Sequence, residues 1–177
     1  MKKAMMVVGF ATLVCLLAVW PTRARAQGML ENVTGTAFDH AVPADFYLEG
    51  NHIPVEKRNA VLLKNAQGAR VVLGLIDTTG YSSQIKQKYI GMLITETKLS
   101  VCGNALGVGS YGFGLERPAA TSNADAPFKI YNQAGEKVGE CAAKKDDSLK
   151  QPKPLAVTAA KDGSAKLCLG KYVVEIK

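Results

Sequence analysis

The segment 89–118 constrains the fold most, because short apolar runs in it alternate with glycine-containing turns. Its first part, residues 89–102, is rich in Ile, Leu, Val and Thr, which favour a pleated and half-buried strand. Gly103 and Asn104 follow, and both residue types adopt the positive φ that a tight turn needs. The glycine-rich run 106–114 then continues as a second strand. The pattern predicts two strands joined by a turn.

The rest of the chain repeats this pattern, with short β-type runs and turn residues between them. We predict further strands over residues 46–48, 58–64, 69–77, 111–117, 128–131, 137–141, 155–160, 165–169 and 172–176, with a turn over residues 49–54. Short strands at this spacing are typical of all-β folds. The sequence therefore predicts an antiparallel β-sandwich or barrel of about nine strands with one short helix.

Two of these segments carry a more specific expectation. Residues 69–77 are apolar on both faces, which predicts a central strand that is covered on both sides. Ser82 or Ser83 can cap the predicted helix over residues 84–89. Tyr81, Ile85 and Tyr89 recur every four residues, so they share one helical face that we expect to cover one end of the core.

The strand predicted over residues 111–117 has an unusual composition. Gly112 and Gly114 alternate with Tyr111, Phe113 and Leu115. One face of this strand is therefore bare backbone, which permits close approach by a neighbouring element or a ligand.

The beginning of the chain has the composition of a secretory signal peptide. Lys2 and Lys3 precede an apolar stretch over residues 5–20, and Ala-Arg-Ala at 24–26 forms a cleavage site. We expect residues 1–26 to be removed and the mature chain to carry no transmembrane span; the alternative is an uncleaved anchor. After the signal peptide we expect a lead-in over 27–45 and one domain over 46–177, with a possible internal boundary in the loop 118–127.

Export changes what the charge of the chain indicates. The sequence has 22 basic and 15 acidic residues and a formal charge of +7, and four of the basic residues lie in the first 26. The mature chain then has a small positive charge, which does not indicate a nucleic-acid partner. We expect a periplasmic or extracellular location.

Three cysteines follow the signal peptide, and an exported protein can oxidise two of them. The candidates for one disulfide are Cys102, Cys141 and Cys168, and the sequence leaves the pairing open. Cys168 shares a strand face with Lys166, which favours an exposed position for it. The wide spacing of the cysteines does not indicate a metal site.

The motifs for catalysis are weak. Residues 107–112 spell G-x-G-x-x-G, but no helical pattern follows to receive a pyrophosphate, so we expect no cofactor. Ser110 lacks the glycine spacing of a nucleophile elbow. An exported hydrolase, the alternative function, would have to combine His40 or His52 with Asp39 or Asp77 and a serine.

Three runs resemble small exported bacterial proteins that have no assigned activity: residues 49–60, 79–83 and 109–114. The resemblance covers most of the mature chain. It implies export and a β fold, and it carries no mechanism or site residue with it.

The leading hypothesis from the sequence is an exported, non-enzymatic envelope protein that binds a partner protein or a cell-envelope component. We expect the binding surface to include Tyr81, Tyr111, Phe113 and Arg117, since aromatic side chains and an arginine suit such contacts. The sequence predicts neither the identity of the ligand nor the oligomeric state.

Overall fold

The fold is described from a computed structural model, which places residues 30–119, 122–160 and 162–177. The predicted signal peptide over 1–26 and the first three residues of the lead-in lie outside the described residues. Lys161, in the last predicted hairpin, lies outside them as well.

The described chain is all-β, with a sheet of thirteen strands and two short helices. The helices are α1 (Thr36–Ala41) and α2 (Ser83–Lys88). The strands are β1 (Glu31–Val33), β2 (Asp45–Leu48), β3 (Asn51–Lys64), β4 (Arg70–Ile76), β5 (Gly91–Thr95), β6 (Leu99–Val101), β7 (Asn104–Leu106), β8 (Gly109–Leu115), β9 (Ala126–Asn132), β10 (Lys137–Lys145), β11 (Ala156–Ala159), β12 (Ala165–Leu169) and β13 (Tyr172–Ile176).

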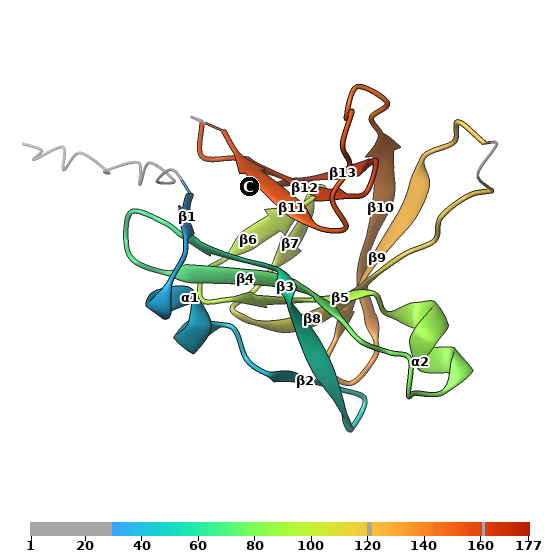
Figure 1. The fold of residues 1–177 in the computed structure, drawn as a ribbon, viewed down its shortest axis with the longest axis horizontal. Helices are drawn as coiled ribbons and strands as arrows, with labels where there is room; N and C mark the ends of the chain where they lie inside the picture. Colours follow the sequence, from blue (N-terminus) through green and yellow to red (C-terminus); the bar gives the residue numbers. More distant parts are fainter. Residues whose placement is uncertain (1–29, 120–121, 161) are drawn as a thin grey trace, which may run out of the picture.

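The strands form one antiparallel sheet that curls into a nearly closed barrel (Figure 1). The order is β1-β3-β4-β5-β8-β9-β10-β13-β12-β11, with β2 paired to β3 and the β6–β7 hairpin joined to β13. The last strand, β11, lies against β3 near the start of the order. The predicted all-β class is confirmed, and the sheet is barrel-like. The predicted strand count is too low, because strands of three residues such as β1, β6 and β7 are too short to show an alternating pattern.

Two predicted turns lie elsewhere. The turn expected over residues 49–54 contains only Glu49 and Gly50, and Asn51–Lys64 forms the single long strand β3. Pro54 lies inside this strand although proline has no N–H to donate. Its carbonyl still accepts a hydrogen bond from Asp77 N at 2.9 Å. The turn expected at Gly103 and Asn104 lies one residue earlier, at Cys102 and Gly103.

Part of the predicted lead-in belongs to the sheet. β1 pairs with the end of β3, from Glu31 opposite Lys64 to Val33 opposite Leu62. α1 follows as a second helix that the sequence did not predict. The loop after β8 leads to β9, and these two strands are neighbours in the sheet.

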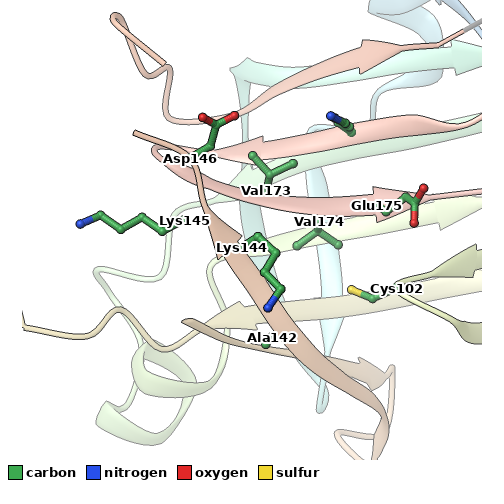
Figure 2. A pocket seen from close by; sticks show the side chains of 9 residues that line it. Cys102, Ala142, Lys144, Lys145, Asp146, Val173, Val174 and Glu175 are labelled. Atoms are coloured by element: carbon green, nitrogen blue, oxygen red, sulfur yellow. The ribbon is translucent and has the colours of Figure 1, made fainter. Parts of the chain in front are cut away.

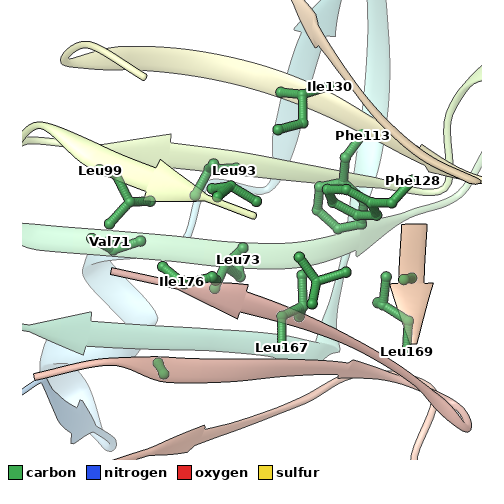
Figure 3. Packing of buried hydrophobic residues seen from close by; sticks show 14 of the residues in the cluster. Val71, Leu73, Leu93, Leu99, Phe113, Phe128, Ile130, Leu167, Leu169 and Ile176 are labelled. Carbon is green, nitrogen blue, oxygen red and sulfur yellow. The ribbon is translucent and has the colours of Figure 1, made fainter. Parts of the chain in front are cut away.

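The barrel encloses the larger of two hydrophobic cores (Figure 3). Val71 and Leu73 of β4 point into it together with Phe113 and Phe128, whose ring centroids are 5.5 Å apart. The second core lies on the outer face of the sheet, where Val72 and its neighbours pack against residues of β2 and α2. β4 is therefore covered on both faces, as its continuous apolar run predicted.

α2 covers the bare backbone face of β8. Ser82 caps this helix, and Ile85 and Tyr89 are buried in the second core with Tyr81 packed beside them. A Cβ atom on Gly112 would lie 2.7 Å from the Tyr89 ring, and one on Gly114 would lie 2.2 Å from the Lys88 carbonyl oxygen. The predicted close approach is real, and the element that makes it is the C-terminal end of α2.

Candidate functional site: a groove in the barrel wall

The wall of the barrel divides where β10 meets β13. These strands pair only through Lys144 opposite Val173 and Lys145 opposite Tyr172. Further along, β13 turns away from β10 and pairs with β6 through Ile176 and Val101. The ladder between β10 and β13 is therefore two residue pairs long, and a groove opens beyond it.

The turn of the β6–β7 hairpin lies at the end of this groove. Cys102 N donates to the Glu175 carbonyl at 2.8 Å, which joins the turn to β13. A disulfide between Cys102 and Cys141 joins the turn to β10, with the two Cα atoms 6.2 Å apart. The Asn104 side-chain amide adds a hydrogen bond of 3.2 Å to the Glu140 carbonyl. The disulfide thus connects the β6–β7 turn to β10, which has no strand pairing with this hairpin in the described chain, and its presence is compatible with export.

The backbone of Cys102 is itself unusual. Its φ is 44° and that of Gly103 is 81°, so both central residues of the turn are left-handed. A two-residue hairpin needs this geometry, but a residue other than Gly, Asn or Asp adopts it at a cost. The disulfide holds Cys102 in this conformation and fixes the end of the groove.

The groove encloses about 560 Å³ and has mixed lining (Figure 2). Apolar groups form its floor, and three lysines and two acidic residues surround them. The lining residues are Cys102, Ala142, Lys144, Lys145, Asp146, Lys166, Val173, Val174 and Glu175.

The acidic groups of the groove already have partners. Glu175 pairs with Lys177 at 3.1 Å. The Asp146 carboxylate accepts hydrogen bonds from the side chain and backbone of Ser148, which hold the pKa of Asp146 below its usual range. Both carboxylates stay ionised, so the lining has three ammonium groups against two carboxylates and an excess of one positive charge.

The three lysine side chains differ in how far other residues hold them in place. Lys145 is held by the Ser122 carbonyl at 3.2 Å and the Asn123 side-chain oxygen at 2.8 Å. Lys144 pairs with Asp125 at 2.6 Å, but its side chain is 74% exposed. The Lys166 side chain is exposed and makes no hydrogen bond or ion pair with any residue that the structure describes, although Lys166 lies opposite Glu175 in the ladder between β12 and β13. Lys144 and Lys166 are therefore the two lysines of the groove that solvent, and so a ligand, can reach most directly.

Cys168 is the third cysteine of the described residues and is half-buried beside the groove. It lies opposite Val173 in the ladder between β12 and β13. Burial, and to a smaller extent the negative charge of Asp146, raises the pKa of its thiol. The thiol therefore stays protonated at neutral pH.

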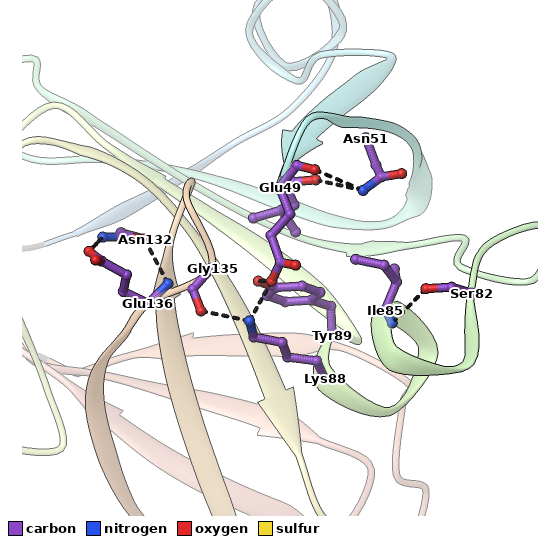
Figure 4. A network of polar contacts seen from close by, with 10 residues as sticks. Glu49, Asn51, Ser82, Ile85, Lys88, Tyr89, Asn132, Gly135 and Glu136 are labelled. Carbon is purple, nitrogen blue, oxygen red and sulfur yellow. Dashed lines mark hydrogen bonds and ion pairs between the residues drawn. The ribbon is translucent and has the colours of Figure 1, made fainter.

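A second polar cluster lies at the opposite side of the fold and joins three elements (Figure 4). Lys88, at the end of α2, donates to the Glu49 carboxylate and, at 2.6 Å, to the Gly135 carbonyl. The Tyr89 hydroxyl donates to the same carboxylate at 2.6 Å. The Lys88 ammonium also lies 4.8 Å from the centre of the Tyr131 ring. The cluster fastens the β2–β3 turn and the β9–β10 turn to α2.

This cluster changes the protonation of its members. The hydrogen bonds from Lys88 and then from Tyr89 lower the pKa of Glu49 below its ordinary value of 4.5. Burial, followed by the hydrogen bond to the Glu49 carboxylate, raises the pKa of Tyr89. All groups of the cluster are thus satisfied by one another, and we assign it a structural role.

The structure places the four residues that the sequence proposed as a binding surface in different surroundings, and only Phe113 is buried. Phe113 is 1% exposed and lies inside the barrel, because odd positions of β8 face the core. Tyr111 is half-buried, and its hydroxyl donates to the Gly107 carbonyl at 3.1 Å. Tyr81 packs on the second core and donates to the His52 carbonyl. Arg117 is exposed in the loop after β8.

The histidines are both exposed. The acidic partner of His52 is Asp45, with 3.5 Å between His52 Nδ1 and Asp45 Oδ1, and it is neither of the predicted residues Asp39 and Asp77. The His52 and Tyr47 rings meet edge to face. The Asp77 carboxylate accepts from Thr79 instead. Among the described residues, no hydrogen bond links a serine to either histidine.

Sequence reasoning missed the groove. Its cysteines and its lysines were visible in the sequence, but the pairing of distant strands that creates the opening was not.

Within residues 30–119, 122–160 and 162–177, no group of His, Cys, Asp and Glu has an arrangement suited to a metal ion. The same residues contain no helix with the length and apolar character needed to cross a membrane.

Comparison with known proteins found no family model, no curated protein and no solved structure that matches this chain.

Proposed function

We propose that the protein is an exported, non-enzymatic binding domain of the cell envelope, and that its binding site is the groove between β10 and β13. The partner is a protein or another envelope component with an anionic group. The observation that carries the proposal is the opening in the wall, where Lys144 and Lys166 stand over an apolar floor.

Export is part of this proposal and rests on the composition of residues 1–26. We expect the protein isolated from its native cell to begin at Gln27, which an intact mass measures. Substitution of Ala26 by Arg should leave the precursor uncleaved, since small residues are needed at the cleavage site. A native protein that begins at Met1 would contradict the proposal.

A photo-cross-linking experiment tests the site. A cross-linking amino acid replaces Lys166 in one variant and Lys86 in a control, because Lys86 is an exposed lysine on α2, away from the groove lining. We expect light to capture a discrete envelope component from position 166 in the native cell and none from position 86. Equal capture from both positions, or capture from position 86 alone, would place the binding surface elsewhere.

A further inference from the structure

The groove exposes one residue of an unpaired strand edge. Asp146 N donates to the Lys171 carbonyl at 2.8 Å, and the Glu140 carbonyl accepts from the Asn104 side chain at 3.2 Å. Both contacts lie on the side of β10 that faces β13 and β6. Alternate residues of an antiparallel strand direct their backbone groups to the same neighbour. Ala142, midway between Glu140 and Lys144, therefore directs its N–H and C=O into the groove.

These two backbone groups have no ladder partner in the described chain. The pairing of β10 with β13 covers Lys144 and Lys145 only. On the other side of β10, Ala142 lies opposite Pro127, which has no N–H and whose carbonyl accepts from Glu116 N at 2.9 Å. Ala142 is also exposed. An unpaired strand edge that is open to solvent can pair with another chain.

The gap at Ala142 is short and closed at both ends. The pair of Lys144 with Val173 closes one end. The disulfide of Cys141 and the contact between Asn104 and Glu140 close the other. A strand that runs through the groove would need a longer free edge. The gap therefore has room for only the terminal residue of another chain to pair with Ala142.

Charge selects which chain end fits. A C-terminal carboxylate is negative, and the groove lining has three lysines against two acidic residues. Lys144 and Lys166 are the two of these lysines whose side chains are exposed. An N-terminal ammonium would be repelled by this excess of positive charge, to which the exposed Lys177 beside Glu175 adds. The floor of the groove consists of Ala142, Val173 and Val174, so a small apolar side chain suits the terminal residue.

We infer that the groove binds the C-terminal residue of a peptide, which pairs with the backbone of Ala142 and places its carboxylate between Lys144 and Lys166. This inference rests on the proposed function, since it names the ligand class of the same groove. Backbone pairing supplies the orientation, and the charge-assisted contacts to lysine supply most of the selectivity.

The test uses N-acetyl-alanyl-alanine and its C-terminal amide as probes. Each is titrated into the ¹⁵N-labelled mature protein, and binding is followed by the amide shifts. We expect the acid to shift the Ala142 amide saturably and the neutral amide to bind at least about tenfold more weakly. Lys166→Gln should lower the affinity for the peptide acid about threefold to tenfold, whereas Lys86→Gln should leave this affinity unchanged.

Equal binding of the acid and the amide would overturn the inference, as would shifts confined to residues outside the groove or no shift at Ala142. The result is separable from the proposed function. If position 166 captures an envelope component and the peptide acid does not bind, the groove remains a binding site and the ligand is not a peptide end. If the acid binds and nothing is captured, the ligand class stands and the envelope partner is wrong.

Discussion

Two residues other than glycine have a positive φ in the described chain, and each is tied to a distant element by its side chain. Glu49 has φ 49° and is bound to Lys88 and Tyr89. Cys102 has φ 44° and is bound to Cys141. A left-handed residue with a Cβ costs roughly 1 kcal/mol or more, so these side-chain contacts offset local strain at both turns.

At Glu49 the ion pair makes stability depend on pH. The pKa of Glu49 is lower in the folded chain than its ordinary value of 4.5, because Lys88 and then Tyr89 donate to it. The stabilisation is therefore complete above the unfolded pKa and is lost as the pH falls through the folded pKa. We expect Glu49→Gln to lower the free energy of unfolding by about 1–2 kcal/mol at pH 7 and by less at pH 3.

Urea unfolding at several pH values measures this difference. Glu31→Gln, at an exposed position on β1, serves as the control and should follow the wild-type curve. A constant difference between Glu49→Gln and wild type across the acid range would contradict the role given to the carboxylate.

At the scale of elements, the packing of α2 on β8 depends on the absence of side chains at two positions. A Cβ atom at Gly114 would lie 2.2 Å from the backbone oxygen of Lys88, which cannot move without the helix. Gly114→Ala should therefore destabilise the fold by about 3 kcal/mol, as severe overpacking does.

Gly80→Ala is the matched control, since a Cβ atom there meets nothing within 4 Å. Chemical denaturation of both variants measures the contrast. If Gly114→Ala unfolds within about 0.5 kcal/mol of Gly80→Ala, α2 does not hold its position on β8 as described.

The β6–β7 hairpin is the second element whose placement depends on a few contacts. The disulfide spans 39 residues of sequence, and closing such a loop in the unfolded chain is worth about 3–4 kcal/mol. We expect the double variant Cys102→Ser and Cys141→Ser to lose about this much stability. Cys168→Ser should lose less than about 1 kcal/mol, because its thiol bonds to nothing.

Thermal unfolding with and without a reductant checks this pair of variants. A reductant should lower the Tm of wild type and of Cys168→Ser, and should leave the double variant unchanged. The mature double variant retains only Cys168, so a drop in its Tm would mean that a disulfide between two copies through Cys168 stabilises the protein.

Local sequence patterns predicted many of the helices and strands. They did not predict which distant strands pair with one another. The serine cap and the four-residue spacing of Tyr81, Ile85 and Tyr89 located α2, and the apolar run of β4 predicted its burial on both faces. The turn at Cys102 was placed one residue late, because Asn104 is also a good turn former and the disulfide that holds Cys102 is a long-range contact. Phe113 was placed on the surface because alternation shows two faces without showing which one is inside.

At the scale of the whole molecule, one irregularity makes the groove. Within the barrel wall, β10 and β13 pair through only two residue pairs, and beyond them β13 pairs with the β6–β7 hairpin instead. The site is thus a product of topology, which explains why no sequence motif marks it. Its residues come from the hairpin turn, β10, the start of the loop after β10, β12 and β13.

Hydrogen exchange of the mature protein, with and without a detergent extract of its native envelope, tests this account most directly. We predict slower exchange at residues 140–146 and 171–175, which border the groove, and unchanged exchange at residues 81–89 of the α2 region. Slower exchange over residues 81–89 with no change at the groove would show that the partner binds the other side of the barrel. That result would contradict the central claim that the opening between β10 and β13 is the binding site.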